Sequence, residues 1–316
     1  MPHHTQLLLV IVGPTGSGKS SLGLLLAERF GGEIVNCDSV QVYRGLDIGS
    51  AKVPVPERRG VTHHLIDIAG PEEDVTAGAY SRLARQALFE IQERHRLPVV
   101  VGGTGLYLRA LLEGLSPAPR RNEALRIRLQ AIVQRRPDGL HRILRRQDPE
   151  AASRIHPNDH QKLIRAIELT LLSGQPATVT QKAPRDGLQG FRILKIGLSP
   201  DRSALRQHIN ARSARMFQDG LIEETKALLA SGISPRSKAL QSLGYRQALN
   251  ALAGTATFAD AVAECQMKTR QYAKRQMTWF RREPDVHWLD GFGTEEHIES
   301  AAIALTESFL RGEQPV

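Results

Sequence analysis

Eight residues near the start of the chain have the types and the spacing of a phosphate-binding loop. Gly13-Pro14-Thr15-Gly16-Ser17-Gly18-Lys19-Ser20 fits the pattern G-x-x-x-x-G-K-[ST], between the apolar run 7–12 and a helical pattern over 19–30. Glycines let backbone N–H groups turn toward a phosphate, and the helix N-terminus adds partial positive charge. Lys19 would bind the outer phosphate, and the Ser20 hydroxyl would bind Mg²⁺. The motif indicates a diphosphate or triphosphate ligand but specifies neither ATP nor hydrolysis.

Two further segments carry polar residues that could act on such a ligand. Asp38 ends a predicted strand over 33–38, and open parallel sheets bind ligands at the carboxyl ends of their strands. Its carboxylate suits a general base acting on an acceptor, although Asp after a strand is also a common turn residue. Thr104 follows the predicted strand 98–101, and it could donate a hydroxyl to a phosphate oxygen or cap a helix.

His63, His64 and Asp67 are candidates for a metal site. Neighbouring residues on a strand point to opposite faces, so two adjacent histidines chelate one ion poorly, and we expect structural roles for both. Asp67 could be a metal-binding carboxylate, but the predicted strand over 64–68 before it contains too short an apolar run to support that role.

The second half of the chain supplies cationic side chains. The planar guanidinium of Arg212 suits a diphosphate. In the segment 274–282, Lys274 and Arg281 could face a nucleic acid, whereas the adjacent Trp-Phe pair is expected in the core.

The elements that would position these residues alternate between strand and helix over residues 1–119. This order predicts an α/β fold with a mostly parallel sheet flanked by helices. Prolines 117 and 119 mark a domain boundary. After it, residues 120–190 have the pattern of helices, and residues 191–198 have the pattern of a strand that returns to the sheet. We therefore expect a core of 1–119 and 191–316 with a helical insertion of 120–190. The longest expected helix runs over 258–281, with a capping box of Thr and Asp at 257 and 260.

Composition excludes several classes of protein. The 316 residues are 41% hydrophobic and 24% charged, as in ordinary globular domains. The first apolar run, residues 7–12, is too short to form the hydrophobic segment of a signal peptide or of a membrane anchor. Cys37 and Cys265 are too few and too distant for a disulfide scaffold or a cysteine zinc site, and they suit a reducing cytoplasm.

Positive charge is concentrated in the predicted insertion. Residues 120–190 contain 14 Lys and Arg against 7 Asp and Glu, a net charge of +7, whereas 1–119 is net −1 and 191–316 is net +3. Such a concentration suits a nucleic-acid partner, because cations on phosphates release condensed counterions. The alternative is a solvated helical face that only aids solubility.

The chain resembles the tRNA dimethylallyltransferase (tRNA isopentenyltransferase) family of bacterial type in seven segments. These are GPTGSGKS at 13–20, DSVQVYRGLDIGSAK at 38–52, HHLID at 63–67, VGGTGLYLRALL at 101–112, NDHQKLIRAIEL at 158–169, SLGYRQAL at 242–249 and AKRQMTWFRR at 273–282. The family transfers a dimethylallyl group from its diphosphate to N6 of the adenosine 3′ of the tRNA anticodon. The resemblance implies the same fold and reaction here.

The resemblance also implies roles for individual residues. The loop 13–20 would hold the donor diphosphate with Mg²⁺ near Ser20, Asp38 would be the base, and Thr104 and Arg212 would act on the leaving group. The implied tRNA contacts are Asp38, Ser39, Val40, Gln41, Thr104, Arg126, Gln161, Lys162, Leu163, Ile164, Arg165, Gln241, Ser242, Leu243, Gly244, Tyr245 and Arg246.

Some positions depart from the family pattern. Gly16 and Ser20 replace the usual Ala and Thr, and Val75 stands where an aromatic residue is usual. A small-molecule P-loop kinase, an ATP-gated RNA-binding module and a prenyltransferase for free adenine nucleotides are the alternatives. We expect a cytoplasmic monomer that binds the tRNA anticodon stem-loop and dimethylallyl diphosphate.

Overall fold

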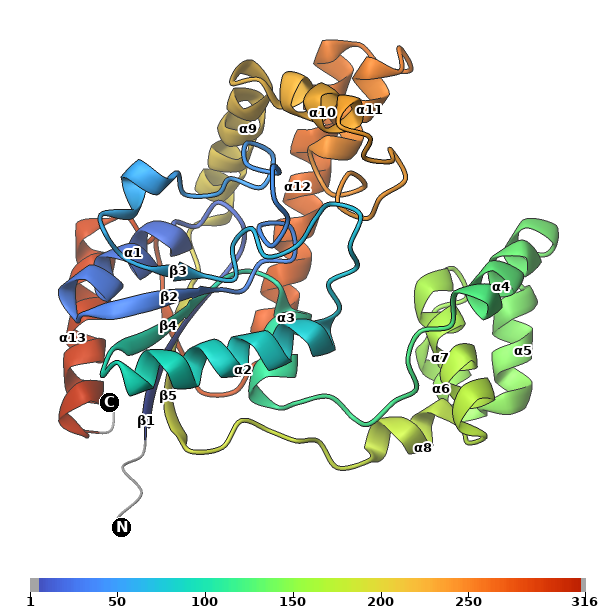
Figure 1. Ribbon diagram of the computed structural model, residues 1–316, viewed down its shortest axis with the longest axis horizontal. Coiled ribbons are helices and arrows are strands. Elements are labelled where there is room, and N and C mark those ends of the chain that lie inside the picture. The colour runs from blue at the N-terminus through green and yellow to red at the C-terminus, as the bar shows by residue number, and fades with distance from the viewer. Residues whose placement is uncertain (1–5, 314–316) are drawn as a thin grey trace. The chain divides into compact units, whose positions relative to one another are not determined.

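The computed structural model describes residues 6–313, and within them six parallel strands form one sheet in the order β3-β2-β4-β1-β5-β6 (Figure 1). The strands are β1 (Gln6–Val12), β2 (Gly32–Asn36), β3 (His63–His64), β4 (Leu97–Val101), β5 (Phe191–Leu198) and β6 (Val286–Leu289). The predicted α/β fold with a parallel sheet is confirmed.

Three strand predictions need correction. The predicted strand 33–38 ends at Asn36, so Asp38 lies in the turn that follows it. The predicted strand 64–68 is reduced to β3, because Leu65 and Asp67 have positive φ angles of 62° and 58°, which interrupt an extended chain. The sequence analysis missed β6, a short edge strand whose residues are only partly buried.

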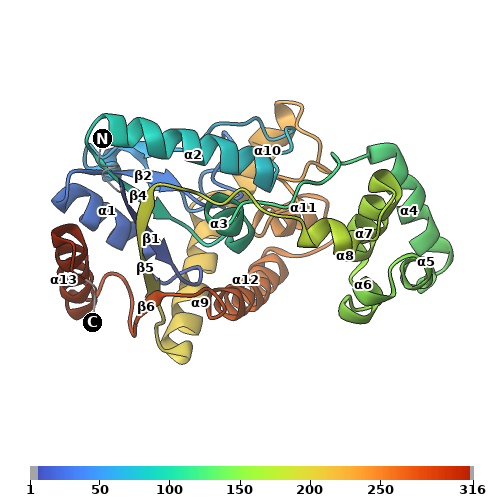
Figure 2. The same cartoon turned by 90° about the horizontal axis from the view of Figure 1, so that it is seen from below.

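The strand β1 is buried on both faces, as its apolar run predicts. Leu8 and Val10 belong to the hydrophobic cluster under α2 (Ala77–Glu93) and α3 (Gly105–Leu112). Leu9 and Ile11 belong to the cluster under α1 (Lys19–Arg29) and α13 (Glu296–Arg311). Side chains of a strand alternate between faces, so this single strand anchors both helical layers (Figure 2).

The second half of the core is mainly helical. Its elements before α13 are α9 (Arg202–Gln218), α10 (Leu221–Ala230), α11 (Tyr245–Leu252) and α12 (Phe258–Phe280). The first half of the chain also contains a short 3₁₀ helix, η1 (Val55–Arg58). The predicted capping box is confirmed, because Thr257 and Asp260 exchange side-chain and backbone hydrogen bonds at the start of α12. Phe280 is buried in the core and Trp279 packs against it.

Residues 113–187 form a second compact unit, separate from the core of residues 1–112 and 188–316. Its helices are α4 (Glu123–Arg135), α5 (Gly139–Gln147), α6 (Pro149–Arg154), α7 (His160–Ser173) and α8 (Ala177–Lys182). The unit begins and ends earlier than 120 and 190, and its two ends meet at Gly114 and Asp186.

The helical unit has its own apolar core and one buried carboxylate. Leu140, Leu144, Leu163 and Ile167 are fully buried in that core. Glu168 is also fully buried, and its carboxylate accepts hydrogen bonds from the backbone N–H of Asn122 and from the guanidinium groups of two arginines on α4 and α7. These bonds join α4 to α7.

Candidate functional site

The phosphate-binding loop lies between β1 and α1, as the motif predicts. Gly16 and Gly18 have φ angles of 82° and 85°, a left-handed conformation that glycine adopts without strain. The Ser17 hydroxyl is buried and has no hydrogen-bond partner among the described residues. The Lys19 ammonium donates to the carbonyl of Pro14 over 2.6 Å. Burial chiefly, and the nearby charge of Arg212, lower the pKa of Lys19 to about 7, while the charge of Asp38 opposes this shift.

Arg212 reaches the same loop from α9. Its guanidinium donates to the hydroxyl of Thr15 over 2.7 Å. Burial lowers the pKa of Arg212 and the charge of Asp38 opposes this, but a guanidinium remains charged at any physiological pH. The structure therefore brings Lys19, Arg212 and Asp38, from three distant segments, within electrostatic reach of one another.

The Asp38 carboxylate has the turn role that its position in the sequence suggested, and one of its oxygens remains without a hydrogen bond among the described residues. One carboxylate oxygen accepts the backbone N–H groups of Val40, over 2.8 Å, and Gln41, over 3.3 Å, and so forms the turn after β2. The other oxygen accepts no hydrogen bond from the described part of the chain. One oxygen thus orients the carboxylate, and the other is available to take a proton.

Thr104 lies beside this turn. Its hydroxyl oxygen accepts the N–H of Ser39 over 3.1 Å, and its own N–H donates to the carbonyl of Cys37 over 3.2 Å. A Cβ atom at Gly102 would lie 2.2 Å from that carbonyl oxygen, so only glycine permits this close approach. The turns after β2 and β4 are therefore held together.

Tyr272 and Gln276, one turn apart on α12, are site residues that the sequence analysis missed. The Tyr272 hydroxyl lies near Thr104, and burial followed by the charge of Asp38 raises the pKa of Tyr272 to about 12, so it stays protonated near neutral pH. The Gln276 amide contacts both the phosphate-binding loop and Gly103. Their helical spacing within a basic, aromatic segment is a signal, but the sequence does not show which face of α12 meets the loops.

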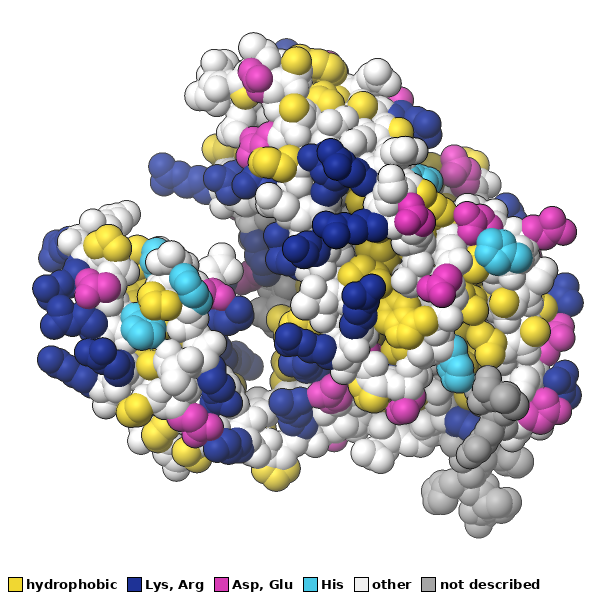
Figure 3. Space-filling model, turned by 180° about the vertical axis from the view of Figure 1, so that it is seen from behind, with side chains coloured by type: hydrophobic (Ala, Val, Ile, Leu, Met, Phe, Trp, Pro, Cys, Tyr) yellow, Lys and Arg dark blue, Asp and Glu magenta, His cyan; other side chains and the backbone are white. Residues whose placement is uncertain are grey.

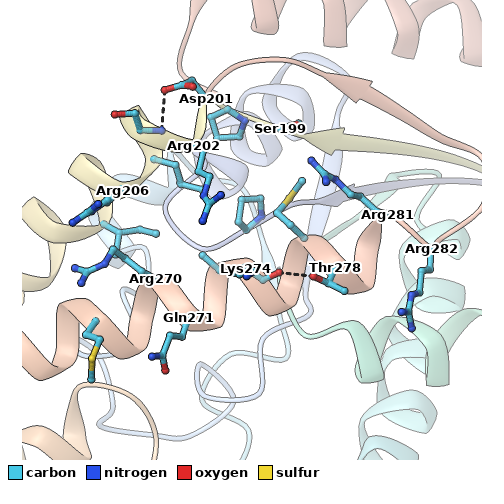
Figure 4. A pocket seen from close by; sticks show the side chains of 18 residues that line it. Ser199, Asp201, Arg202, Arg206, Arg270, Gln271, Lys274, Thr278, Arg281 and Arg282 are labelled. Carbon is cyan, nitrogen blue, oxygen red and sulfur yellow. Dashed lines mark hydrogen bonds between the residues drawn. The ribbon is translucent and has the colours of Figure 1, made fainter. Parts of the chain in front are cut away.

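A pocket with a volume of about 1110 Å³ opens between α9 and α12 and reaches Pro14 of the phosphate-binding loop (Figure 4). Its floor is apolar and includes Ile209 and Ala273. Cationic side chains surround the floor, namely Arg202, Arg206, Arg270, Lys274, Arg281 and Arg282. The one carboxylate in the lining, Asp201, caps the start of α9. The pocket therefore favours an anionic ligand.

Comparison with known proteins agrees with this architecture. A model of the IPP transferase family matches residues 41–283. The "tRNA dimethylallyltransferase" of Koribacter versatilis is 57% identical over 96% of this chain and 98% of the relative, and that of Solibacter usitatus is 51% identical over 96% and 99%. This chain belongs to the IPP transferase family. The predicted family resemblance is confirmed.

Solved structures of IPP transferases are similar along the whole chain. A Bacillus halodurans tRNA isopentenylpyrophosphate transferase superimposes with a TM-score of 0.71, at 38% identity, over 97% of this chain and 96% of that one. A eukaryotic dimethylallyltransferase described as acting on tRNA gives a TM-score of 0.81 at 28% identity, over 98% of this chain and 80% of that one. The family match at 41–283 includes the helical unit and all of α12.

Several residues expected to contact tRNA are buried in this IPP transferase. Leu163 and Ile164 belong to the core of the helical unit, and Tyr245 is fully buried, so these side chains cannot reach a nucleic acid. In the same two segments Gln161, Lys162, Gln241 and Arg246 are exposed. Ser242 and Leu243 are partly buried, and Gly244 is buried at the start of α11.

Two of the arginines expected to bind tRNA form ion pairs inside the helical unit. Arg126 forms a two-point ion pair with Glu168 at 3.0 Å, and Arg165 lies 2.7 Å from the same carboxylate. Burial alone would raise the pKa of Glu168, but hydrogen bonds from Arg126, Asn122 and Arg165 outweigh burial and lower it to about 2. Both guanidinium groups therefore compensate a buried charge.

The remaining polar candidates have structural roles. A ring nitrogen of His64 lies 2.6 Å from the Glu33 carboxylate, and a ring nitrogen of His63 lies 2.9 Å from the carbonyl of Val61, which confirms the structural prediction for both. Asp67 pairs with Lys52 at 2.6 Å, so a lysine compensates its charge. Residues 6–313 hold no cluster of three acidic, histidine or cysteine side chains suited to a metal ion. None of their helices combines the length and the apolar composition needed to cross a bilayer.

Proposed function

We propose that this protein transfers a dimethylallyl group from dimethylallyl diphosphate to N6 of the adenosine 3′ of the tRNA anticodon. The observation that carries the proposal is the convergence of Asp38 with Lys19 and Arg212 beside the phosphate-binding loop. A base next to two cations suits a reaction that removes a proton from one substrate and an anion from the other. Other reactions also remove a proton from one substrate and an anion from the other, and membership of the IPP transferase family favours prenyl transfer among them.

The reaction breaks the bond between the donor's C1 carbon and its diphosphate oxygen. Positive charge spreads over the allylic carbons, and the N6 lone pair forms the new C–N bond. Lys19, Arg212 and the backbone N–H groups of the loop stabilise the departing diphosphate, which keeps the bonding electrons. The free oxygen of Asp38 takes the N6 proton, so charge and atoms balance.

We propose that Thr104 acts at the leaving oxygen. Its hydroxyl group lies beside the Asp38 turn and within a hydrogen bond of Ser39. That position would allow the Thr104 proton to stabilise negative charge as the C–O bond lengthens.

The loop suits Mg²⁺ bound together with a diphosphate. Ser20 is exposed in the first turn of α1, and in loops of this type the Ser or Thr hydroxyl binds Mg²⁺ together with phosphate oxygens and water. The buried, unpartnered Ser17 hydroxyl offers a further donor to a phosphate. Bound Mg²⁺ would neutralise part of the diphosphate charge.

The partner that suits the charge of the helical unit is tRNA. Figure 3 shows dark blue Lys and Arg side chains over this unit. Its exposed arginines with no ion pair among the described residues would bind phosphates: Arg120, Arg128, Arg135, Arg145 and Arg146. The target adenine must leave its stack to reach Asp38, which requires a firm hold on the RNA backbone. The cationic pocket beside Pro14 supports the binding of a phosphorylated substrate to the core. We expect the enzyme to act as a monomer in the cytoplasm, where tRNA is modified.

The deciding experiment incubates the purified protein and Mg²⁺ with unmodified tRNA and radiolabelled dimethylallyl diphosphate. We expect the label in tRNA, confined to the adenosine beside the anticodon. The alternative is a small-molecule P-loop kinase, in which Asp38 would activate an acceptor hydroxyl. Unlabelled tRNA together with phosphoryl transfer from ATP in the same buffer would contradict the proposal and favour the kinase.

A further inference from the structure

Gln276 on α12 connects the loops that would hold the two substrates. Its side-chain oxygen accepts the backbone N–H of Thr15 over 2.8 Å, and its side-chain nitrogen donates to the carbonyl of Gly103 over 2.7 Å. Thr15 belongs to the phosphate-binding loop, and Gly103 precedes Thr104. One buried amide therefore bridges segments that lie about ninety residues apart in the sequence.

The chemistry of these contacts admits few other side chains. A backbone N–H can only donate and a carbonyl can only accept, so the bridging group needs one acceptor and one donor. A neutral amide of this length has both. An ionised carboxylate has only acceptors, and a Lys or Arg side chain has only donors. The two partners also determine which end of the Gln276 amide faces which loop.

The surrounding contacts are tight. A Cβ atom at Gly103 would lie 2.2 Å from the Gln276 nitrogen, and one at Gly105 would lie 2.3 Å from the ring of Trp279, which is on the next turn of α12. On the other side, the Thr15 hydroxyl accepts the bond from Arg212. The end of α12 thus restrains both loops, and the Gln276 amide is the polar link between them.

We propose that Gln276 is a positioning residue that holds the donor-binding loop and the Thr104 turn at the separation required for transfer. The inference rests on the proposed function, because it assigns the donor diphosphate to the phosphate-binding loop and the leaving oxygen to Thr104, whose turn is bonded to the turn that carries Asp38. It predicts an effect on kcat, since a misplacement of about 1 Å between reacting groups costs about 100-fold in rate.

The test compares Gln276→Leu, Gln276→Glu and the wild-type protein. The matched control is Gln92→Leu, which removes an amide that donates to the carbonyl of Leu7 away from the site. We expect Gln276→Leu to lower kcat by about 100-fold with little change in the KM of dimethylallyl diphosphate, while Gln92→Leu keeps the wild-type kcat. A wild-type kcat in Gln276→Leu would overturn the proposal.

The pH dependence of Gln276→Glu separates positioning from a loss of stability. A protonated glutamic acid can donate to Gly103 as the amide does, whereas the ionised form cannot. The ratio of kcat in Gln276→Glu to kcat in the wild type is therefore expected to rise as the pH falls. Because Asp38 is present in both proteins, taking the ratio removes the effect of its ionisation on kcat. A ratio that does not change with pH would overturn the proposal, even if Gln276→Leu failed to fold.

Failure of the proposed function would be recognised separately. If the wild-type protein transfers no label to tRNA, hydrogen exchange still tests the bridge. Residues 13–20 and 102–107 should then exchange faster in Gln276→Leu than in Gln92→Leu. Equal exchange in the two variants would overturn the bridging role independently of any activity.

Discussion

At the scale of single residues, the proposed mechanism gives the two oxygens of Asp38 different roles. One accepts the backbone N–H groups of Val40 and Gln41, so the side chain cannot turn away from the site. Asp38→Asn keeps this acceptor and removes the base. We expect this variant to fold and to bind the donor normally, while transfer falls about 100- to 10,000-fold.

The measurements for Asp38→Asn are single-turnover label transfer and the affinity for dimethylallyl diphosphate. Asp38→Ala is the comparison variant, because it loses the turn as well as the base. A normal transfer rate in Asp38→Asn would remove Asp38 from the mechanism.

Lys19 makes donor binding depend on pH. With a pKa of about 7 in the free protein, Lys19 loses its charge as the pH rises above 7, whereas a bound diphosphate favours the charged form. Donor binding should therefore take up a proton. Above pH 7 the Kd should increase with pH, by up to about tenfold per pH unit.

The control for this prediction is Lys19→Arg, because arginine stays charged over the whole range. Ionisation of the donor itself affects both proteins equally, so the difference between their pH slopes isolates Lys19. Calorimetry in buffers of different ionisation enthalpy measures the proton uptake. Equal slopes would show that Lys19 keeps its proton in the free protein.

At the scale of elements, α4 and α7 are joined by the buried Glu168 carboxylate. Glu168→Gln removes the negative charge and leaves two guanidinium groups facing an uncharged amide. Breaking a buried ion pair of this kind costs about 3 kcal/mol. We expect faster hydrogen exchange across residues 113–187 and unchanged exchange in residues 6–112.

A matched control lies in the same unit. Glu150 on α6 pairs with Arg154 and Lys182 at the surface, so Glu150→Gln should change stability by less than about 1 kcal/mol. Because the folded pKa of Glu168 is lowered to about 2, its contribution is present above about pH 4.5 and is lost as the pH falls toward 2. An unaltered exchange pattern in Glu168→Gln would contradict this account.

At the scale of the whole molecule, the arginines expected to bind tRNA are the exposed ones that do not compensate a carboxylate within the described part of the chain. Arg145 and Arg146 are exposed on α5, on the opposite side from its buried Leu140 and Leu144. We expect Arg145→Gln with Arg146→Gln to weaken tRNA binding. The slope of log K against log salt should decrease in magnitude by about 1 to 2.

The salt titration has a control in the core. Arg29 is an exposed arginine on α1 that pairs with Glu307, and Arg29→Gln should leave the slope unchanged. If the double variant also keeps the wild-type slope, the tRNA does not contact this part of the helical unit.

The sequence alone determined the family, the parallel α/β sheet and the phosphate-binding loop. These features are determined by residues close together in the sequence, namely an apolar run, glycines at fixed spacing and a helical pattern that begins at Lys19. It also suggested Asp38, Thr104 and Arg212 as candidate site residues, because Asp38 ends a predicted strand, Thr104 follows one and the guanidinium of Arg212 suits a diphosphate.

Only the tertiary structure decided which side chains are free to act. Arg126 and Arg165 match a tRNA-binding pattern, yet their guanidinium groups compensate Glu168, which is distant in sequence from Arg126. The sequence around Gln276 does not show its role, because that role depends on the place where α12 meets two loops from the first half of the chain. The physical reason is the same in both cases. Hydrogen bonding and charge compensation depend on partners brought together by packing, and a linear pattern does not record them.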